Sequence, residues 1–258
     1  MSLKPMLTVG LFTAALAAPV LGADFHWQGK VAAGATVEIK GVNGGIEASA
    51  APGSEVEVTA VKHARHSNPA EVEIKVVEHE GGVTICAVYP SPSSTPNECR
   101  PGAGARMRTQ NNDTSVDFTV KVPAGARFVG RTVNGGIEAE SLSGDAEAYT
   151  VNGGIKMKAS GQARGETVNG GITASLGRTN WTGALAFKTV NGGITLDLPA
   201  DAGVELTAET VNGDITTDFP LTVQGRLSKR RISATIGSGG RQLSLSTVNG
   251  GIQIRKGS

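Results

Sequence analysis

The chain has 258 residues and is almost neutral, with 24 Lys and Arg against 23 Asp and Glu, which argues against bulk nucleic-acid binding through a cationic footprint. Apolar residues make up 39% and charged residues 18%, so the composition is that of a folded protein rather than a disordered polyelectrolyte. Glycine is abundant at 36 residues while aromatic residues contribute only 4%, which favours a fold of turns and thin layers.

The first 23 residues have the pattern of a cleaved secretory signal peptide. Lys4 supplies the positive start, residues 7–20 form a short apolar run, and small residues end at Ala23. Cleavage is expected after Ala23, and because Asp24 follows rather than cysteine, no lipid anchor is expected there. No later stretch approaches the ~18 apolar residues of a spanning helix. We therefore expect a periplasmic or secreted mature chain, residues 24–258, forming one domain without a transmembrane segment.

Three segments in the N-terminal half alternate apolar and polar residues with a period of two, which is typical of half-buried strands. The segments are 55–60, 71–76 and 116–122. No long amphipathic helical pattern interrupts them. The sequence predicts an all-β protein.

The only two cysteines, Cys86 and Cys99, lie 13 positions apart. In an oxidising compartment such a pair is more typical of a disulfide than of a metal site. The enclosed segment is rich in Pro and Ser, and closing it is expected to stabilise the fold by ~3 kcal/mol on the chain-entropy model. We interpret residues 86–115 as an insertion closed by this disulfide.

The hexapeptide Thr-Val-Asn-Gly-Gly-Ile occurs five times, and two further copies, GVNGGI and TVNGDI, each differ at one position. We predict that its asparagines mark structural turns: Asn43, Asn134, Asn152, Asn169, Asn191, Asn212 and Asn249. From the second to the sixth copy the spacings are 18, 17, 22 and 21 residues. The last spacing, 37, fits two repeats of which one has degenerated. The first, 91, is expected to hide several degenerate repeats and the insertion.

Two architectures fit a repeat of about 20 residues. Asn-Gly between alternating segments is a strong hairpin signal, so seven hairpins could form an antiparallel meander. A β-solenoid instead requires the same turn at nearly the same period, because each coil stacks on the last. Asn and Gly suit its corners, and stacked Asn side chains can bond along the axis. We favour the β-solenoid.

In the solenoid, two repeat positions are expected to form ladders in the core. The isoleucines are those at 46, 137, 155, 172, 194, 215 and 252. The valines are those at 42, 133, 151, 168, 190, 211 and 248. Thr150 and its equivalents are expected on the opposite side, as an outward threonine strip.

The repeated TVNGGI units, the signal peptide and the closing segment IGSGGRQLSLSTVNGGIQIRK resemble the bacterial DUF4097 family of putative adhesins. The resemblance is strongest over residues 128–256 and extends back toward residue 37. It implies an extracytoplasmic repeat protein of stacked strands. It implies no established reaction, ligand or catalytic residue.

No motif in the sequence indicates catalysis, a cofactor or a metal centre. His63 and His66 are an odd number of residues apart, which places them on opposite faces of a strand. Among the seven repeat turns only Asp214 is acidic, so the tandem calcium sites of other solenoids are not expected. Residues 237–240 read as a turn rather than a nucleophile elbow. We predict neither an enzyme nor a bound cofactor or metal.

A basic cluster lies near the C-terminus of this otherwise neutral chain. It comprises Arg226, Lys229, Arg230 and Arg231, with Arg241, Arg255 and Lys256 further along. One interpretation is a solvated rim that discourages edge pairing at the last coil. The other is contact with anionic envelope components.

These features together predict a non-catalytic scaffold or adhesion module of the cell envelope. Its expected partner is an envelope polymer, an anionic surface or another protein, and not nucleic acid. The first alternative is an envelope-stress accessory that binds a membrane sensor through the Cys86–Cys99 loop. The second alternative is a solenoid enzyme acting on polysaccharide.

Overall fold

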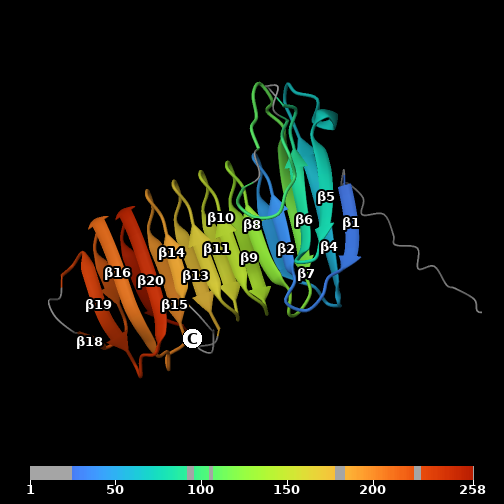
Figure 1. Ribbon diagram of the computed structural model, residues 1–258. Helices are drawn as coiled ribbons and strands as arrows, with labels where there is room; N and C mark the ends of the chain where they lie inside the picture. The colour runs from blue at the N-terminus through green and yellow to red at the C-terminus, as the bar shows by residue number, and fades with distance from the viewer. Residues whose placement is uncertain (1–24, 92–95, 105–106, 178–183, 224–227, 258) are drawn as a thin grey trace, which may run out of the picture.

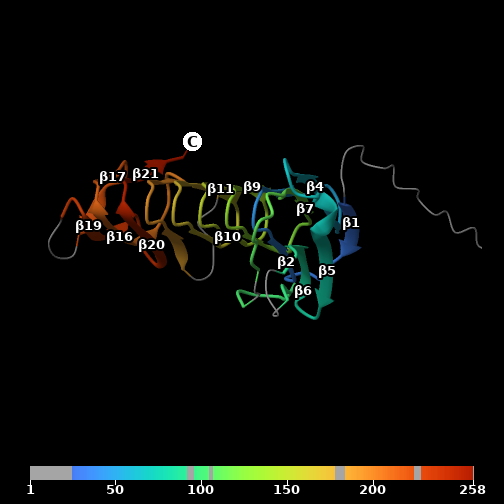
Figure 2. The same ribbon diagram turned by 90° about the horizontal axis from the view of Figure 1, so that it is seen from above.

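Each sequence repeat places one strand in each of two facing β-sheets (Figure 1). The computed structural model describes residues 25–91, 96–104, 107–177, 184–223 and 228–257. The predicted signal peptide and Arg226 lie outside these residues. Seen from above, the sheets form two layers along one axis (Figure 2). Within the described ranges, no helix is long and apolar enough to cross a membrane.

Sheet A has 10 strands. In spatial order they are β1 (Phe25–Lys30), β4 (Glu55–His63), β7 (Ser115–Val122), β3 (Ile46–Ala50), β9 (Ile137–Leu142), β11 (Ile155–Ala159), β13 (Ile172–Leu176), β15 (Ile194–Leu198), β21 (Ile252–Lys256) and β17 (Ile215–Thr217). A short 3₁₀ turn, Pro69–Glu71, follows β4.

Sheet B has 11 strands. In spatial order they are β18 (Leu221–Val223), β19 (Arg231–Ile236), β16 (Val204–Asn212), β20 (Arg241–Asn249), β14 (Leu185–Lys188), β12 (Ala163–Glu166), β10 (Ala146–Tyr149), β8 (Arg127–Arg131), β2 (Thr36–Lys40), β6 (Gly82–Val88) and β5 (Glu73–His79).

The repeat strands pair in parallel, which confirms the solenoid and not the antiparallel meander. In sheet A, Ile155 of β11 is in register with Ile172 of β13, and Ile172 with Ile194 of β15. In sheet B, β8, β10, β12 and β14 pair in the same way. Like residues therefore meet like residues from one coil, or rung, to the next.

Antiparallel strands cover both ends of the stack. At the N-terminal end, β4 and β1 extend sheet A beyond β7, and β5 extends sheet B beyond β6. At the C-terminal end, β19 pairs antiparallel with β16, and β18 with β19. Because a solenoid coil has open strand edges, such terminal strands limit further stacking.

The order of the rungs in space differs from the order in sequence, which corrects the predictions for the two long spacings. The Asn43 rung bridges directly to the Asn134 rung. Of the several degenerate repeats expected in the 91-residue spacing, one is present, because β6 and β7 pair in parallel with β2 and β3 on the other side of the Asn43 rung. The Asn249 rung lies between those of Asn191 and Asn212, since β20 pairs with both β14 and β16 (Figure 1). The 37-residue spacing thus reflects a chain that leaves the stack, forms β18 and β19, and returns.

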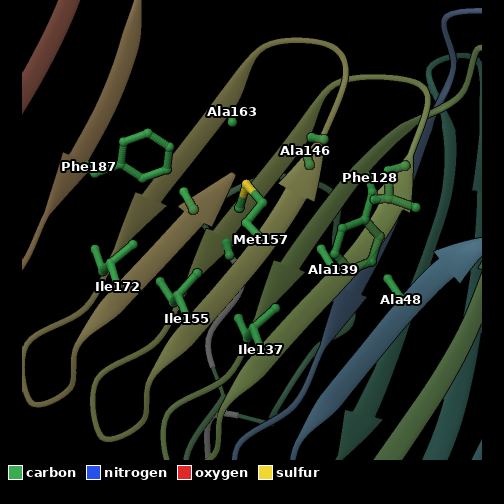
Figure 3. Close-up of a cluster of buried hydrophobic side chains, with 14 of the residues drawn as sticks. Ala48, Phe128, Ile137, Ala139, Ala146, Ile155, Met157, Ala163, Ile172 and Phe187 are labelled. Atoms are coloured by element: carbon green, nitrogen blue, oxygen red, sulfur yellow. The ribbon is translucent and has the colours of Figure 1, made fainter. Parts of the chain in front are cut away.

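The isoleucine ladder forms the middle of the core. Figure 3 shows Ile137, Ile155 and Ile172 in a row from successive strands of sheet A. Six of the seven isoleucines are at most 2% exposed, whereas Ile215 on the short terminal β17 is only partly buried. Phe128, Ala146, Ala163 and Phe187 fill the space from sheet B. The thin core explains why a glycine-rich, aromatic-poor sequence folds.

The predicted valine ladder and outward threonine strip were both wrong, because their orientations are exchanged. Val151, Val168, Val211 and Val248 are 38–55% exposed, and among the repeat valines only Val42 is fully buried. Thr150 and its equivalents are buried. In β10, Ala146 and Ala148 face inward, so alternation carries Thr150 inward and turns Val151 to solvent.

Candidate functional site

The repeat asparagines form a continuous amide ladder at the corners that lead from sheet B to sheet A. Each Nδ2 donates to the Oδ1 of the neighbouring rung at 2.7–2.9 Å. At the N-terminal end, Asn43 donates instead to the carbonyl oxygen of Thr114 at 3.3 Å. All amides therefore point the same way along the axis. Each retains a second N–H and a second lone pair for other contacts.

The buried threonines and the first glycine of each repeat also have packing roles. Thr150 Oγ1 donates to the Gly135 oxygen at 2.9 Å, and the other repeat threonines make the equivalent bond at 2.8–3.1 Å. From the Asn134 copy onward, a Cβ on the first glycine would lie 1.9–2.1 Å from a backbone oxygen of the adjacent rung. Threonine, asparagine, first glycine and isoleucine are thus explained by the fold.

The second glycine is exposed in most copies, and the fold does not strictly require it. A Cβ there would contact its neighbour at 3.2–3.6 Å, and Asp214 occupies this position in the TVNGDI copy. Along four rungs these glycines border a shallow depression of about 550 Å³ on sheet A. Its outward side chains are Glu47, Glu138, Lys156 and Thr173. Such an open, mixed-charge surface suits contact with an extended partner more than enclosure of a small substrate.

The predicted basic cluster lies at the C-terminal end of the stack. Lys229 and Arg230 are exposed in the turn before β19, and Arg231 pairs with Glu209 at 2.7 Å. We call Lys229, Arg230 and Arg231 the basic rim. Arg255 and Lys256 belong elsewhere, since β21 lies in sheet A, where Arg255 pairs with Asp197.

The backbone of the basic rim covers the last corner of the solenoid. The Arg230 oxygen accepts from Thr210 N at 2.9 Å, and the Lys229 oxygen from Ile215 N at 3.1 Å. In inner rungs the next repeat accepts these bonds, as Gly251 does from Ile194. The segment therefore takes the place of a further coil while its cationic side chains remain in solvent. This is the arrangement expected of a solvated rim that discourages strand pairing at the last coil.

The predicted disulfide joins Cys86 of β6 to Cys99, with a Cα–Cα distance of 5.6 Å. It holds residues 97–102, here called the strap, over the outer face of sheet B. Beneath the strap, the buried Lys40 Nζ donates to the backbone oxygens of Arg100 and Gly102. Burial lowers the pKa of Lys40, and the neighbouring Glu38 carboxylate opposes this shift.

Glu38 is the centre of the buried charge network under the strap. Its carboxylate accepts from Arg131 Nε at 3.0 Å, Thr84 Oγ1 at 3.1 Å and the Gly102 backbone N–H at 2.9 Å. Arg131 also lies over the Tyr149 ring, 4.1 Å from its centroid. Buried charges require such partners, so the strap supplies bonds that water would otherwise provide.

We expect replacement of both cysteines by Ser to lower the free energy of unfolding by about 3 kcal/mol, because the open chain regains loop entropy. The β-sheet circular dichroism signal should persist, since the strap lies outside the core ladder. Urea unfolding followed by circular dichroism measures both quantities. Complete loss of the β signal would show that the strap is required for the solenoid to form.

The histidines considered as metal ligands pair with carboxylates instead. His66 Nδ1 lies 3.1 Å from Asp113 Oδ2, and His63 Nε2 lies 3.9 Å from Asp117 Oδ2. Bonds from Ser67 and His66 hold the pKa of Asp113 well below its usual range. In the residues that the structure describes, no group of three or more His, Cys, Asp or Glu side chains is arranged to hold a metal ion.

Comparison with known proteins places the repeated part of the chain in context. The model of the family described as Toastrack DUF4097 matches residues 129–255, which contain six of the seven repeat copies. A solved putative cell adhesion protein from Clostridium sporogenes is 13% identical with a TM-score of 0.47, covering 90% of this chain and 99% of its own. A putative adhesin from Bacteroides fragilis is 11% identical with a TM-score of 0.37, covering 90% and 96%. No curated protein matches the sequence.

Proposed function

The protein belongs to the Toastrack DUF4097 family, and we propose that it is a non-catalytic scaffold or adhesion module of the cell envelope. The observation that supports this role best is the basic rim at the end of a rigid, repetitive β stack. Its backbone completes the last corner, so its cationic side chains are held at a fixed place on the surface.

We propose that the rim contacts an anionic envelope polymer or surface in the periplasm or outside the cell. Lys229 and Arg230 carry exposed charges, and the nearly zero net charge of the chain would not repel an anionic partner. Attraction between exposed charges is screened by salt, with a Debye length of about 10 Å at 0.1 M. Binding through the rim should therefore weaken steeply as salt is raised.

The test is co-sedimentation of the mature protein with purified cell-wall and outer-envelope fractions across a salt series. Replacing Lys229, Arg230 and Arg231 by Ser is expected to weaken binding at least tenfold at low salt, because three cationic contacts are lost. The matched control replaces three exposed cations distant from the rim by Ser: Lys30, Arg108 and Lys158. It removes the same net charge and should retain most of the binding.

Equal loss in both variants would mean that net charge rather than the rim governs binding. Unchanged binding and salt dependence in the rim variant would overturn the proposed contact. Release of soluble glycan fragments by the wild-type protein would contradict a non-catalytic role. If no fraction binds, a protein partner at the strap becomes the favoured alternative, because Arg100 and residues 101–104 are exposed there.

A further inference from the structure

The exposed valines of the repeat form a continuous apolar row beside the amide ladder. Four described large hydrophobic residues are exposed, and all four belong to this row: Val151, Val168, Val211 and Val248. The half-buried Val190 lies on the rung between Val168 and Val248, and the half-buried Val133 lies on the rung before Val151. We call these six residues the valine edge. Contiguous exposed apolar surface on a soluble domain commonly marks an interaction site.

Core packing accounts for this repeat valine only in the first two copies, where Val42 belongs to the core and Val133 packs against it. Other outward positions vary freely: the residue after the repeat isoleucine is Glu, Lys, Thr or Gln. Valine is nevertheless present in all seven copies, although only Val42 is fully buried. A solvent-facing position without a partner would tolerate polar residues equally well. The repetition therefore points to a contact that the isolated chain does not make.

We propose that the valine edge is a self-association surface on which a second copy of the chain packs. A repeating row is matched best by a partner with the same repeat distance, here the ~4.8 Å between neighbouring strands. An extended peptide lying along the row would present side chains on one face every ~6.7 Å and would lose register. A second copy matches the spacing at every rung.

The chemistry of the edge also suits an identical partner. The corners of the inner rungs carry no charged residue, so two copies can approach there without like-charge repulsion. Charges occur only at the last corner, where Asp214 lies beside Lys229 and Arg230. The faces beside the edge carry both charges, since Lys156 pairs with Glu138 on sheet A and Arg164 pairs with Glu166 on sheet B. Because all ladder amides point one way, antiparallel packing about a two-fold axis would also oppose their dipoles.

The size of the edge predicts weak, reversible association. Six valines on successive rungs span about 24 Å at ~4.8 Å per step. With the flanking amides this buries less than the ~800 Å² per partner of a standard stable interface. Interfaces at this low end dissociate readily, so we expect a dissociation constant in the micromolar range rather than the nanomolar range.

Sedimentation velocity of the mature protein from about 2 to 500 µM tests the proposal, since this range brackets micromolar association. The wild type should shift from monomer to dimer as concentration rises. Replacing Val151 and Val168 by Glu should weaken association at least tenfold, because each interface would then contain four buried like charges. The control places two Glu at exposed positions on the outer face of sheet B, Thr207 and Thr222, and should associate like wild type.

A second variant keeps the result interpretable if substitution merely perturbs the fold. Val151→Lys with Val168→Lys should also be monomeric alone, but an equal mixture of the Lys and Glu variants should regain association. Restoration on mixing supports copy-to-copy contact through the valine edge. A wild type that stays monomeric at every concentration, or a Glu variant that associates like wild type, would overturn the proposal.

Discussion

Replacing Gly170 by Ala is expected to lower the free energy of unfolding by about 3–5 kcal/mol, the range of severe single-site defects. A Cβ at this first glycine would lie 2.1 Å from the backbone oxygen of Gly153. Neither atom belongs to a flexible side chain, so the two rungs must move apart. That movement would stretch the Gly153 N to Asn169 O bond of 2.9 Å, which joins the same two rungs, and the amide ladder beside it.

The neighbouring substitution, Gly171→Ala, is a matched control for backbone entropy. A Cβ there would lie 3.4 Å from the Gly193 oxygen, and Asp214 already occupies the equivalent position in another copy. We expect its effect on stability to remain within about 1 kcal/mol. Urea unfolding at a common protein concentration gives both values. Equal effects would mean that close rung contact does not explain the first glycine.

The solenoid could be predicted because the repeat encodes a local rule that holds at every coil. Alternation around Ile155, the Asn-Gly turn and the near-constant spacing all predict the same stacked geometry. The signal for the inward threonine was also present. Extending the alternation of Ala146 and Ala148 to Thr150 would have placed it in the core and Val151 outside.

The order of the rungs could not be predicted, because the repeat that makes the solenoid predictable is nearly identical in every rung. Near-identical repeats offer near-identical partners, so Asn249 is locally as suited to one neighbour as to another. Its place between the Asn191 and Asn212 rungs depends on β18 and β19 occupying the end of sheet B. The position of the Asn249 rung therefore depends on packing between segments far apart in the sequence, which the repeat itself does not encode.

The strap shows a second limit of prediction from sequence. Glu38 and Lys40 alternate with buried Val37 and Ile39, which normally indicates a charged, solvent-facing side. Their burial arises from backbone groups of a segment about 60 positions away, as with the Lys40 bond to Gly102. Nearly every residue has a backbone N–H and a carbonyl group, so the residue types do not show which of them bind Glu38 and Lys40. Only the Cys86–Cys99 link indicates that the segment folds back onto this face.

Ile172→Asp is expected to prevent stable folding at neutral pH. Ile172 is 1% exposed in the middle of the stack and in register with Ile155 and Ile194. Loss of the side chain costs about 2–5 kcal/mol, and burial of an unpaired carboxylate adds several more. Because desolvation raises the pKa of such a carboxyl, its destabilisation should be greatest at high pH and smaller once the group is protonated.

Thr173→Asp is the control for Ile172→Asp, because Thr173 is the next residue of β13 and is exposed. It adds the same charge one position away and should leave the thermal midpoint nearly unchanged. Thermal unfolding by circular dichroism compares the variants over a pH series. If Ile172→Asp unfolds at the wild-type midpoint, Ile172 does not face the core, and the register of the parallel ladder is wrong. Because successive side chains of a strand point to opposite faces, a register error of one residue would reverse the outcomes for Ile172→Asp and Thr173→Asp.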